Sequence, residues 1–189
     1  MGSIASVPAM SFLFALLSVV AEIAVVVGLV LWIGGKVSPG WARAGSLARE
    51  AIAPSALWLA WIVALTNTLG SLYLSEVAHF IPCKLCWYQR IAMYPLVVLL
   101  LVAAIKHSRE IARATLPLIA IGAAISMYHY LVERFPSMAG GASCDPTAPC
   151  TVVWIWRFHY LSIPGMALSG FLLIGLLVLL VPREIQKET

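Results

Sequence analysis

The chain has 189 residues, of which 62% are hydrophobic and 11% are charged, and its formal net charge is +4. A soluble domain of this length could not bury the apolar surface that a mean hydropathy of +0.97 implies. The composition therefore excludes a soluble enzyme and indicates an integral membrane protein. The basic residues are few and spread along the loops, which argues against nucleic-acid binding.

Five apolar segments are long enough to cross a bilayer as helices, at ~1.5 Å per residue. They are residues 11–33, 55–78, 87–105, 115–132 and 159–181. The first does not read as a cleaved signal peptide, because it lacks a basic leading region and its apolar run is too long. The pattern predicts an all-α, polytopic membrane protein.

The first segment and the interval after it carry polar features of their own. Glu22 lies in the middle of the first span. It is either a protonated carboxyl packed against neighbouring helices or a proton or ligand site. Residues 34–54 form a polar interval in which Ser38 and Pro39 can start a short helix with one apolar face. We expect this helix to lie on the membrane surface.

A Cys-x-x-Cys pair stands at the entrance of the third apolar segment. Residues 79–90 read HFIPCKLCWYQR and place Cys83 and Cys86 at the expected start of a helix. Two thiols at this spacing can close a reversible disulfide, and a helix N-terminus favours the reactive thiolate at the second position. Arg90 lies one turn deeper on the face of Cys86, where a guanidinium needs a task or a partner. The stretch indicates a redox site in the mouth of a membrane helix.

A second cysteine pair, Cys144 and Cys150, lies in a loop rich in Gly and Pro. Three interpretations compete for the four cysteines. They form two structural disulfides, although a Cys-x-x-Cys bridge constrains the unfolded chain little. They bind one tetrahedral zinc ion, although an oxidising compartment works against free thiolates. Or they exchange with each other and with outside molecules, as a relay between the aqueous and lipid phases requires.

Positive charges indicate the orientation of the five spans. The basic residues of one set of loops are Lys36, Arg43, Arg49, Lys106, Arg109, Arg113, Arg183 and Lys187, against Lys84, Arg90, Arg134 and Arg157 in the other. Cytoplasmic loops are richer in Lys and Arg, so we expect the first set, and the C-terminus, in the cytoplasm. The N-terminus and both cysteine pairs then lie on the extracytoplasmic side, where the two pairs can meet.

Two histidines, His79 and His129, lie near the expected outer ends of helices. They are either interfacial hydrogen-bonding residues or a pair that holds a haem in a membrane cytochrome. The roles of Glu76 and His79, which lie just before the Cys-x-x-Cys pair, do not follow from the sequence.

Three stretches of the chain resemble one family. Residues 71–76 (SLYLSE), 82–95 (PCKLCWYQRIAMYP) and 144–171 are similar to the DsbB/BdbC disulfide-bond formation proteins, in particular to the short BdbC branch. Members are membrane thiol oxidases that pass electrons to quinone. The resemblance implies that residues 55–189 form a four-helix quinone-reducing core, with residues 1–54 as an additional N-terminal helix and cytoplasmic loop. It also implies a bacterial cell membrane location.

The resemblance implies an order of exchange among the cysteines. Cys144 would take the attack of a reduced, soluble, extracytoplasmic partner with a thioredoxin fold. Cys150 would then exchange with Cys83, and Cys86 would deliver the electrons to the quinone. The related vitamin K epoxide reductases place their loop cysteine pair before their Cys-x-x-Cys pair in the sequence. This chain has the reverse order, which disfavours membership of that group.

The resemblance also implies residues that bind the quinone, which would be ubiquinone or menaquinone. Arg90 would support the bound quinone, and His129 matches a histidine that family members place near it. Arg90 can donate to a quinone carbonyl, whose oxygen gains negative charge on reduction. Gln89, on a neighbouring face, is either a second donor or an outward-packing residue. We expect no metal at this site.

Overall fold

The computed structural model describes residues 6–139 and 148–181. Within these ranges the regular secondary structure is helical apart from one isolated bridge between Arg157 and Leu161, and loops connect the helices. The α-helices are α1 (Ser6–Val37), α2 (Pro39–Ile52), α3 (Ala56–Leu72), α4 (Lys84–Ile105), α5 (Arg109–Ala114), α6 (Leu116–Arg134) and α7 (Ile163–Leu180). Short 3-10 helices span Ala53–Ser55 and Pro136–Ala139, and a π-helix spans Tyr73–Val77. Five helical stretches are long and apolar enough to cross a membrane, which confirms the predicted fold class.

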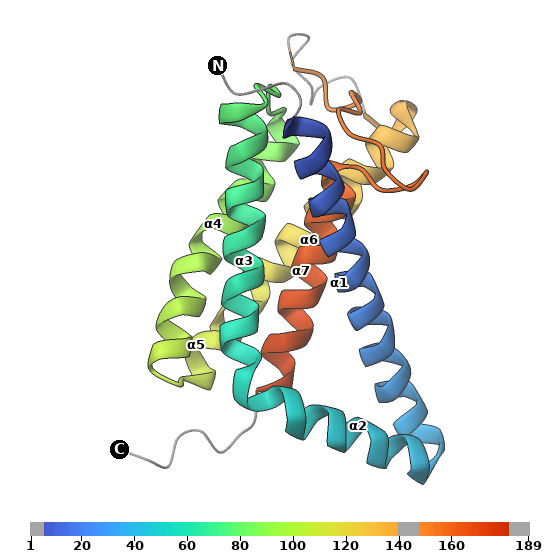
Figure 1. The fold of residues 1–189 in the computed structure, drawn as a ribbon, viewed down its shortest axis with the longest axis vertical. Coiled ribbons are helices and arrows are strands. Elements are labelled where there is room, and N and C mark those ends of the chain that lie inside the picture. The colour runs from blue at the N-terminus through green and yellow to red at the C-terminus, as the bar shows by residue number, and fades with distance from the viewer. Residues whose placement is uncertain (1–5, 140–147, 182–189) are drawn as a thin grey trace.

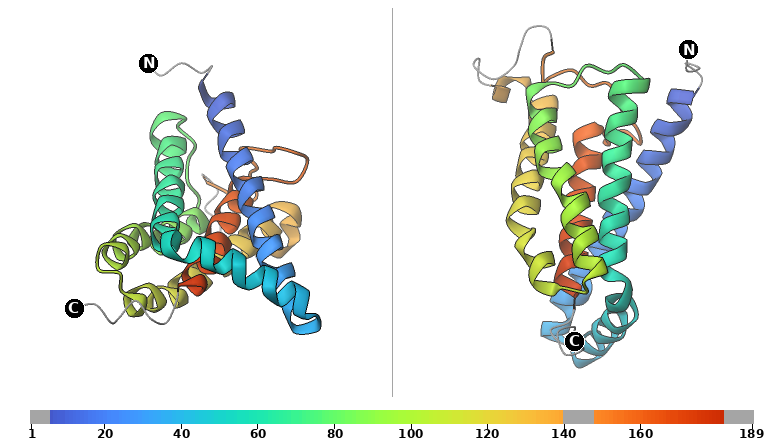
Figure 2. Two further views of the ribbon diagram at one scale, coloured as in Figure 1. Left: turned by 60° about the horizontal axis from the view of Figure 1, so that its bottom comes forward. Right: turned by 90° about the vertical axis from the view of Figure 1, so that its left-hand side faces the viewer.

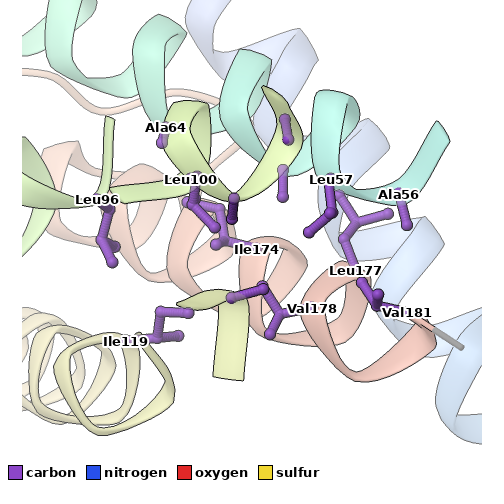
Figure 3. Packing of buried hydrophobic residues seen from close by; sticks show 14 of the residues in the cluster. Ala56, Leu57, Ala64, Leu96, Leu100, Ile119, Ile174, Leu177, Val178 and Val181 are labelled. Atoms are coloured by element: carbon purple, nitrogen blue, oxygen red, sulfur yellow. The ribbon is translucent and has the colours of Figure 1, made fainter. Parts of the chain in front are cut away.

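Helices α3, α4, α6 and α7 form a four-helix bundle around one apolar core (Figures 1 and 2). Small residues let these helices approach closely, which matters because van der Waals packing drives helix association within lipid. Ala60, Ala64 and Ala103 are fully buried. A Cβ added at Gly122 of α6 would collide with the ring of Phe171 in α7. Figure 3 shows the larger side chains that fill the space between the helices.

Helix α1 is the additional N-terminal span, and it packs against α7 of the bundle and against α2, which follows it in the chain. In Figure 1 it begins beside α3 and α7 and diverges from α3 toward the opposite end of the molecule. There α2 runs from the end of α1 to the start of α3. Helix α2 begins at Pro39, after Ser38, and buries none of its residues within the protein. The predicted short helix is confirmed, and its position on the membrane surface remains a prediction.

The last helix begins later than the sequence predicts. The expected span started at residue 159, whereas α7 starts at Ile163. Phe158 and His159 have φ angles of 52° and 64°, in the left-handed region, which an α-helix does not use. They form a tight turn that is closed by the bridge between Arg157 and Leu161. The prediction that His159 opens the last span is therefore wrong.

The segment before the cysteines leaves α3 through an unusual turn. The π-helix Tyr73–Val77 ends the third helix, and His79 follows with a φ of 56°. A π turn widens the helix by one residue and is common at functional sites. From here an extended stretch leads to Pro82 and Cys83, where α4 begins. Glu76 and His79 are both exposed at this end of the bundle.

Candidate functional site

Cys83 and Cys86 form a dithiol at the start of α4. Cys83 is the N-cap residue, with extended φ and ψ of −74° and 174°, and its sulfur accepts from the Cys86 backbone N–H at 3.4 Å. This capping contact fixes the side chain over the first turn of the helix. The two Sγ atoms lie 3.1 Å apart, with the Cys83 thiol donating to Cys86. The helix start thus places the two sulfurs next to each other.

The Cys83 thiol keeps its proton at neutral pH. Its pKa is raised from 9.0 to about 12, first by the hydrogen bond to Cys86 and then by burial. The contact with His129 acts in the opposite direction. Cys83 is only 5% exposed, so water solvates its charged form poorly. The proton therefore stays on Cys83 and points at the Cys86 sulfur.

His129 of α6 lies against Cys83. Its Nε2 is 3.5 Å from the Cys83 sulfur, and its Nδ1 is 3.3 Å from Nε2 of Gln89. In this amide orientation Gln89 donates to Nδ1, so the proton of a neutral imidazole sits on Nε2 and faces Cys83. Both ring nitrogens of the 3%-exposed histidine thus face protein groups. Neither is directed at a haem, and His79 is exposed on the loop.

The guanidinium of Arg90 is held by α3. Its Nε donates to Ser71 Oγ at 2.9 Å, and its Nη2 donates to the Ser71 carbonyl at 3.0 Å. Cζ of Arg90 also lies 5.2 Å from the centre of the Trp87 ring. Ser71 precedes the π-helix, so the change of helical register occurs beside the arginine. The sequence marks Ser71 only as a polar position within a span. Its pairing with Arg90 depends on how the two helices are rotated.

A largely apolar cavity of about 340 Å³ opens beside the dithiol. This volume falls within the ~300–1,000 Å³ of small-molecule sites. Residues from α1, α3, α4 and α7 line it, and Cys86, Gln89 and Arg90 reach its wall from α4. His129 is not among the lining residues. The structure therefore brings Cys86 and Arg90 to one cavity and places His129 behind Cys83.

Tyr94 is a lining residue that the sequence did not single out. It lies one turn beyond Arg90 on α4, and its hydroxyl is buried without a hydrogen-bond partner in the described part of the chain. An orphaned donor in an apolar cavity suits a ligand that carries an acceptor oxygen. A quinone, with an apolar ring and two carbonyl oxygens, fits these residues. The sequence signal that could have identified Tyr94 is its position four residues after Arg90, which places both residues on one face of a helix.

The loop pair is described in part. Cys144 lies outside the described residues. Cys150 is 1% exposed and belongs to the same buried cluster as Cys83, Leu85 and Val132. It is also close enough to Cys86 for an electrostatic interaction. Cys150, one of the two loop cysteines, therefore lies next to the Cys83/Cys86 pair.

Aromatic contacts hold the segment after Cys150 against the bundle. The rings of Phe80 and Trp154 are stacked, with centroids 5.0 Å apart and an interplanar angle of 17°. Arg134 lies over the ring of Trp156, with Cζ 4.6 Å from its centre. These two contacts hold the segment after Cys150 against Phe80, which lies just before Cys83, and against Arg134 at the end of α6.

The site also contains potential ligands for a metal. The sulfurs of Cys83 and Cys86 and a ring nitrogen of His129 all lie within 4.8 Å of one another. Zinc prefers such donors, at ~2.3 Å from sulfur and ~2.0 Å from nitrogen. The zinc interpretation of the sequence used four cysteines, whereas this cluster takes two of them with a histidine.

Comparison with known proteins gives one family. The family described as "Disulfide bond formation protein DsbB" matches residues 53–181. Disulfide bond formation protein C of Bacillus subtilis is 44% identical over 128 residues, which cover 68% of this chain and 93% of that relative. A probable disulfide formation protein of Oceanobacillus iheyensis is 44% identical over 133 residues, covering 70% of this chain and 92% of the relative.

A more distant relative is a probable disulfide formation protein of Coxiella burnetii. It is 36% identical over 133 residues, which cover 70% of this chain and 90% of that protein. No solved structure matches the chain. The family match covers the bundle α3, α4, α6 and α7 together with the described cysteines, and it leaves α1 and α2 outside. The chain belongs to the DsbB family of disulfide bond formation proteins.

Proposed function

We propose that this chain is a membrane thiol:quinone oxidoreductase. It reoxidises a soluble extracytoplasmic dithiol oxidase with a thioredoxin fold, passing electrons through Cys144/Cys150 and then Cys83/Cys86 to ubiquinone or menaquinone. One observation supports it above the others. The dithiol contacts the Cys150 region on one side, and its Cys86 reaches an apolar cavity on the other. Two inert structural disulfides would need neither contact.

The exchange steps balance in atoms and electrons. The reduced partner attacks Cys144 of the loop disulfide, and a second partner thiolate releases Cys144, so the partner is oxidised and Cys144/Cys150 becomes a dithiol. The Cys150 thiolate then attacks the Cys83 sulfur of the membrane disulfide, and Cys86 leaves as a thiolate. Cys144 resolves the Cys150–Cys83 bond and releases Cys83, which takes up a proton. Two electrons have then moved to Cys83/Cys86.

The quinone accepts two electrons and two protons from the membrane dithiol. The protein's part is to place Cys86 at the cavity wall and to hold donors there. Arg90, fixed by Ser71, offers a positive charge where oxygen gains negative charge on reduction. Cys83 keeps a proton beside Cys86 until the disulfide re-forms. His129 holds a proton at Nε2 against Cys83 and can return one to this sulfur when it is released.

We propose the same division of the chain and the same orientation as the sequence indicates. Residues 55–189 form the catalytic core, and residues 1–54 are an extension of it. The start of α1 and the cysteine region lie at one end of the molecule, while α2 and α5, with their basic residues, lie at the other (Figure 1). This arrangement supports an extracytoplasmic cysteine site and a cytoplasmic C-terminus.

Anaerobic mixing of the reduced partner, this protein and a soluble quinone tests the function. We expect quinone reduction that depends on both cysteine pairs and is lost in Cys86→Ser. Reduction that survives this substitution would refute the electron path. A redox titration tests the alternative of a non-catalytic protein with two structural disulfides. Catalytic pairs titrate at potentials near those of exchange proteins, and structural pairs resist reduction.

A further inference from the structure

Helix α1 lines the cavity that holds Cys86 and Arg90, although it lies outside the family match. The lining residues from α1 include Phe14, Leu17, Ser18 and Ala21. We propose that α1 is a wall of the quinone site and contacts the hydrocarbon part of the bound quinone. This inference rests on the proposed function and assigns a role to a helix that the family match does not explain.

The chemistry of the wall indicates which part of the ligand it meets. Arg90, Gln89 and Tyr94 reach the cavity from α4, and the other polar lining residues of the bundle, Thr66, Asn67, Ser71 and Ser75, come from α3 and the π-helix that follows it. The hydroxyl of Ser18 donates to the Phe14 carbonyl of its own helix at 2.9 Å, so α1 offers apolar surface. The ring carbonyls of a quinone therefore belong at α3 and α4. The isoprenoid chain and ring substituents, which need no donors, match α1.

Phe14 closes the seam between α1 and α3 at this level. A Cβ added at Gly70 would lie 3.2 Å from Cζ of Phe14, so the phenyl ring sits directly on the α3 backbone. The ring also makes an edge contact with Tyr73, with centroids 6.4 Å apart. Gly70 precedes Ser71, the residue that holds Arg90. The apolar wall thus adjoins the arginine site through two consecutive residues of α3.

Hydrogen bonds anchor α1 on both sides of its lining stretch. On one side, Arg157 donates to Ser11 Oγ at 2.8 Å and to the Pro8 carbonyl at 3.2 Å. On the other, Glu22 accepts from Tyr160 Oη at 2.6 Å and from Ser169 Oγ at 2.9 Å. The mid-span carboxyl therefore has packing partners on α7 and the preceding turn.

The anchors explain why α1 is more than a membrane tether. The hydrogen bond that Tyr160 donates to Glu22 raises the pKa of Tyr160 to about 12, so this phenol keeps its donor hydrogen throughout the physiological range. A helix that served only to hold the protein in lipid would not need polar contacts to the turn before α7. Here they fix the register of α1, which keeps residues 14–21 on the cavity.

Steady-state kinetics of full-length variants test the inference. Phe14→Ala removes the ring at the seam, and Val26→Ala, at a 57%-exposed position of α1 outside the cavity lining, is the matched control. With a quinone that carries an isoprenoid chain, we expect Phe14→Ala to raise KM about tenfold. The rise should shrink with a chainless benzoquinone. KM for the reduced partner should not change, and the control should behave as the wild type.

Photolabelling of the wild-type protein with an azido derivative of an isoprenoid quinone gives a second readout that needs no variant. We expect label on the peptide that contains residues 14–21. Label confined to α3, α4 and α7, or equal KM values for Phe14→Ala and Val26→Ala, would overturn the role of α1. Failure of the wild type to reduce any quinone would instead refute the proposed function.

Discussion

His129 Nε2 lies 3.5 Å from Cys83 Sγ, across 46 residues and between two different helices. This contact predicts that the histidine serves thiol exchange at Cys83. Acid–base groups contribute ~10²–10⁴-fold to such steps, so His129→Ala should slow electron transfer from the loop pair to the membrane pair by about a hundredfold. Rapid-quench alkylation without quinone measures this rate. His159→Ala, on the exposed turn, is the control.

The opposite pattern for His129 would favour a direct quinone contact. In that case the exchange rate would stay normal and KM for quinone would rise.

Arg90→Ala should weaken quinone binding. The substitution removes the cation that Ser71 holds at the cavity wall, and a hydrogen bond to a charged group contributes ~1.5–3 kcal/mol. We expect KM for quinone to rise by between about 10- and 100-fold, while KM for the reduced partner stays the same. Steady-state assays with each substrate varied separately distinguish the two. Arg134→Ala, which removes the contact with Trp156 at a position outside the cavity lining, is the control. An unchanged quinone dependence would remove Arg90 from the site.

The raised pKa of Cys83 predicts how the stability of the reduced protein depends on pH. A thiol that binds its proton more tightly in the folded chain stabilises the fold fully below the unfolded pKa. With values of 9.0 unfolded and about 12 folded, this contribution is lost as the pH rises through that interval. The Tm of the reduced protein should therefore fall more steeply above pH 9 than that of Cys83→Ser. Parallel curves would contradict the shift.

Gly122→Ala should destabilise the bundle. Its new Cβ would collide with the fully buried ring of Phe171, and overpacking of this kind costs about 1–3 kcal/mol. Gly175→Ala is the matched control, because its Cβ would meet Ile119 at an ordinary 3.4 Å. Thermal unfolding in detergent should show a lower Tm for the first variant only. Equal values would mean that α6 and α7 can separate at no cost.

The elements that the sequence predicted correctly depend on local signals. Long apolar runs specify the spans, and Pro39 marks the start of α2. The start of α7 was missed because Phe158 and His159 adopt left-handed conformations that glycine normally marks. The bridge between Arg157 and Leu161 holds Phe158 and His159 in this turn, against the usual preference of non-glycine residues for negative φ.

The candidate site was predictable in its cysteines and less so in their surroundings. The Cys-x-x-Cys spacing and the position of Arg90 lie within one helix, so helical periodicity relates them. The contacts of His129 with Cys83, of Ser71 with Arg90 and of Glu22 with Tyr160 join different elements. They depend on helix rotation and on a π turn, which periodicity does not report.

The stacked rings of Phe80 and Trp154 have a consequence for the kinetics of the relay. They join the segments next to Cys83 and Cys150 without a bond that oxidation or reduction would break. In the proposed relay, each exchange between the two pairs would then be a unimolecular event at a high effective concentration, and it would require no diffusive search. The rate of this internal step should be first order and independent of how dilute the protein is in the membrane. Only the meeting with the soluble partner and the arrival of quinone would depend on concentration.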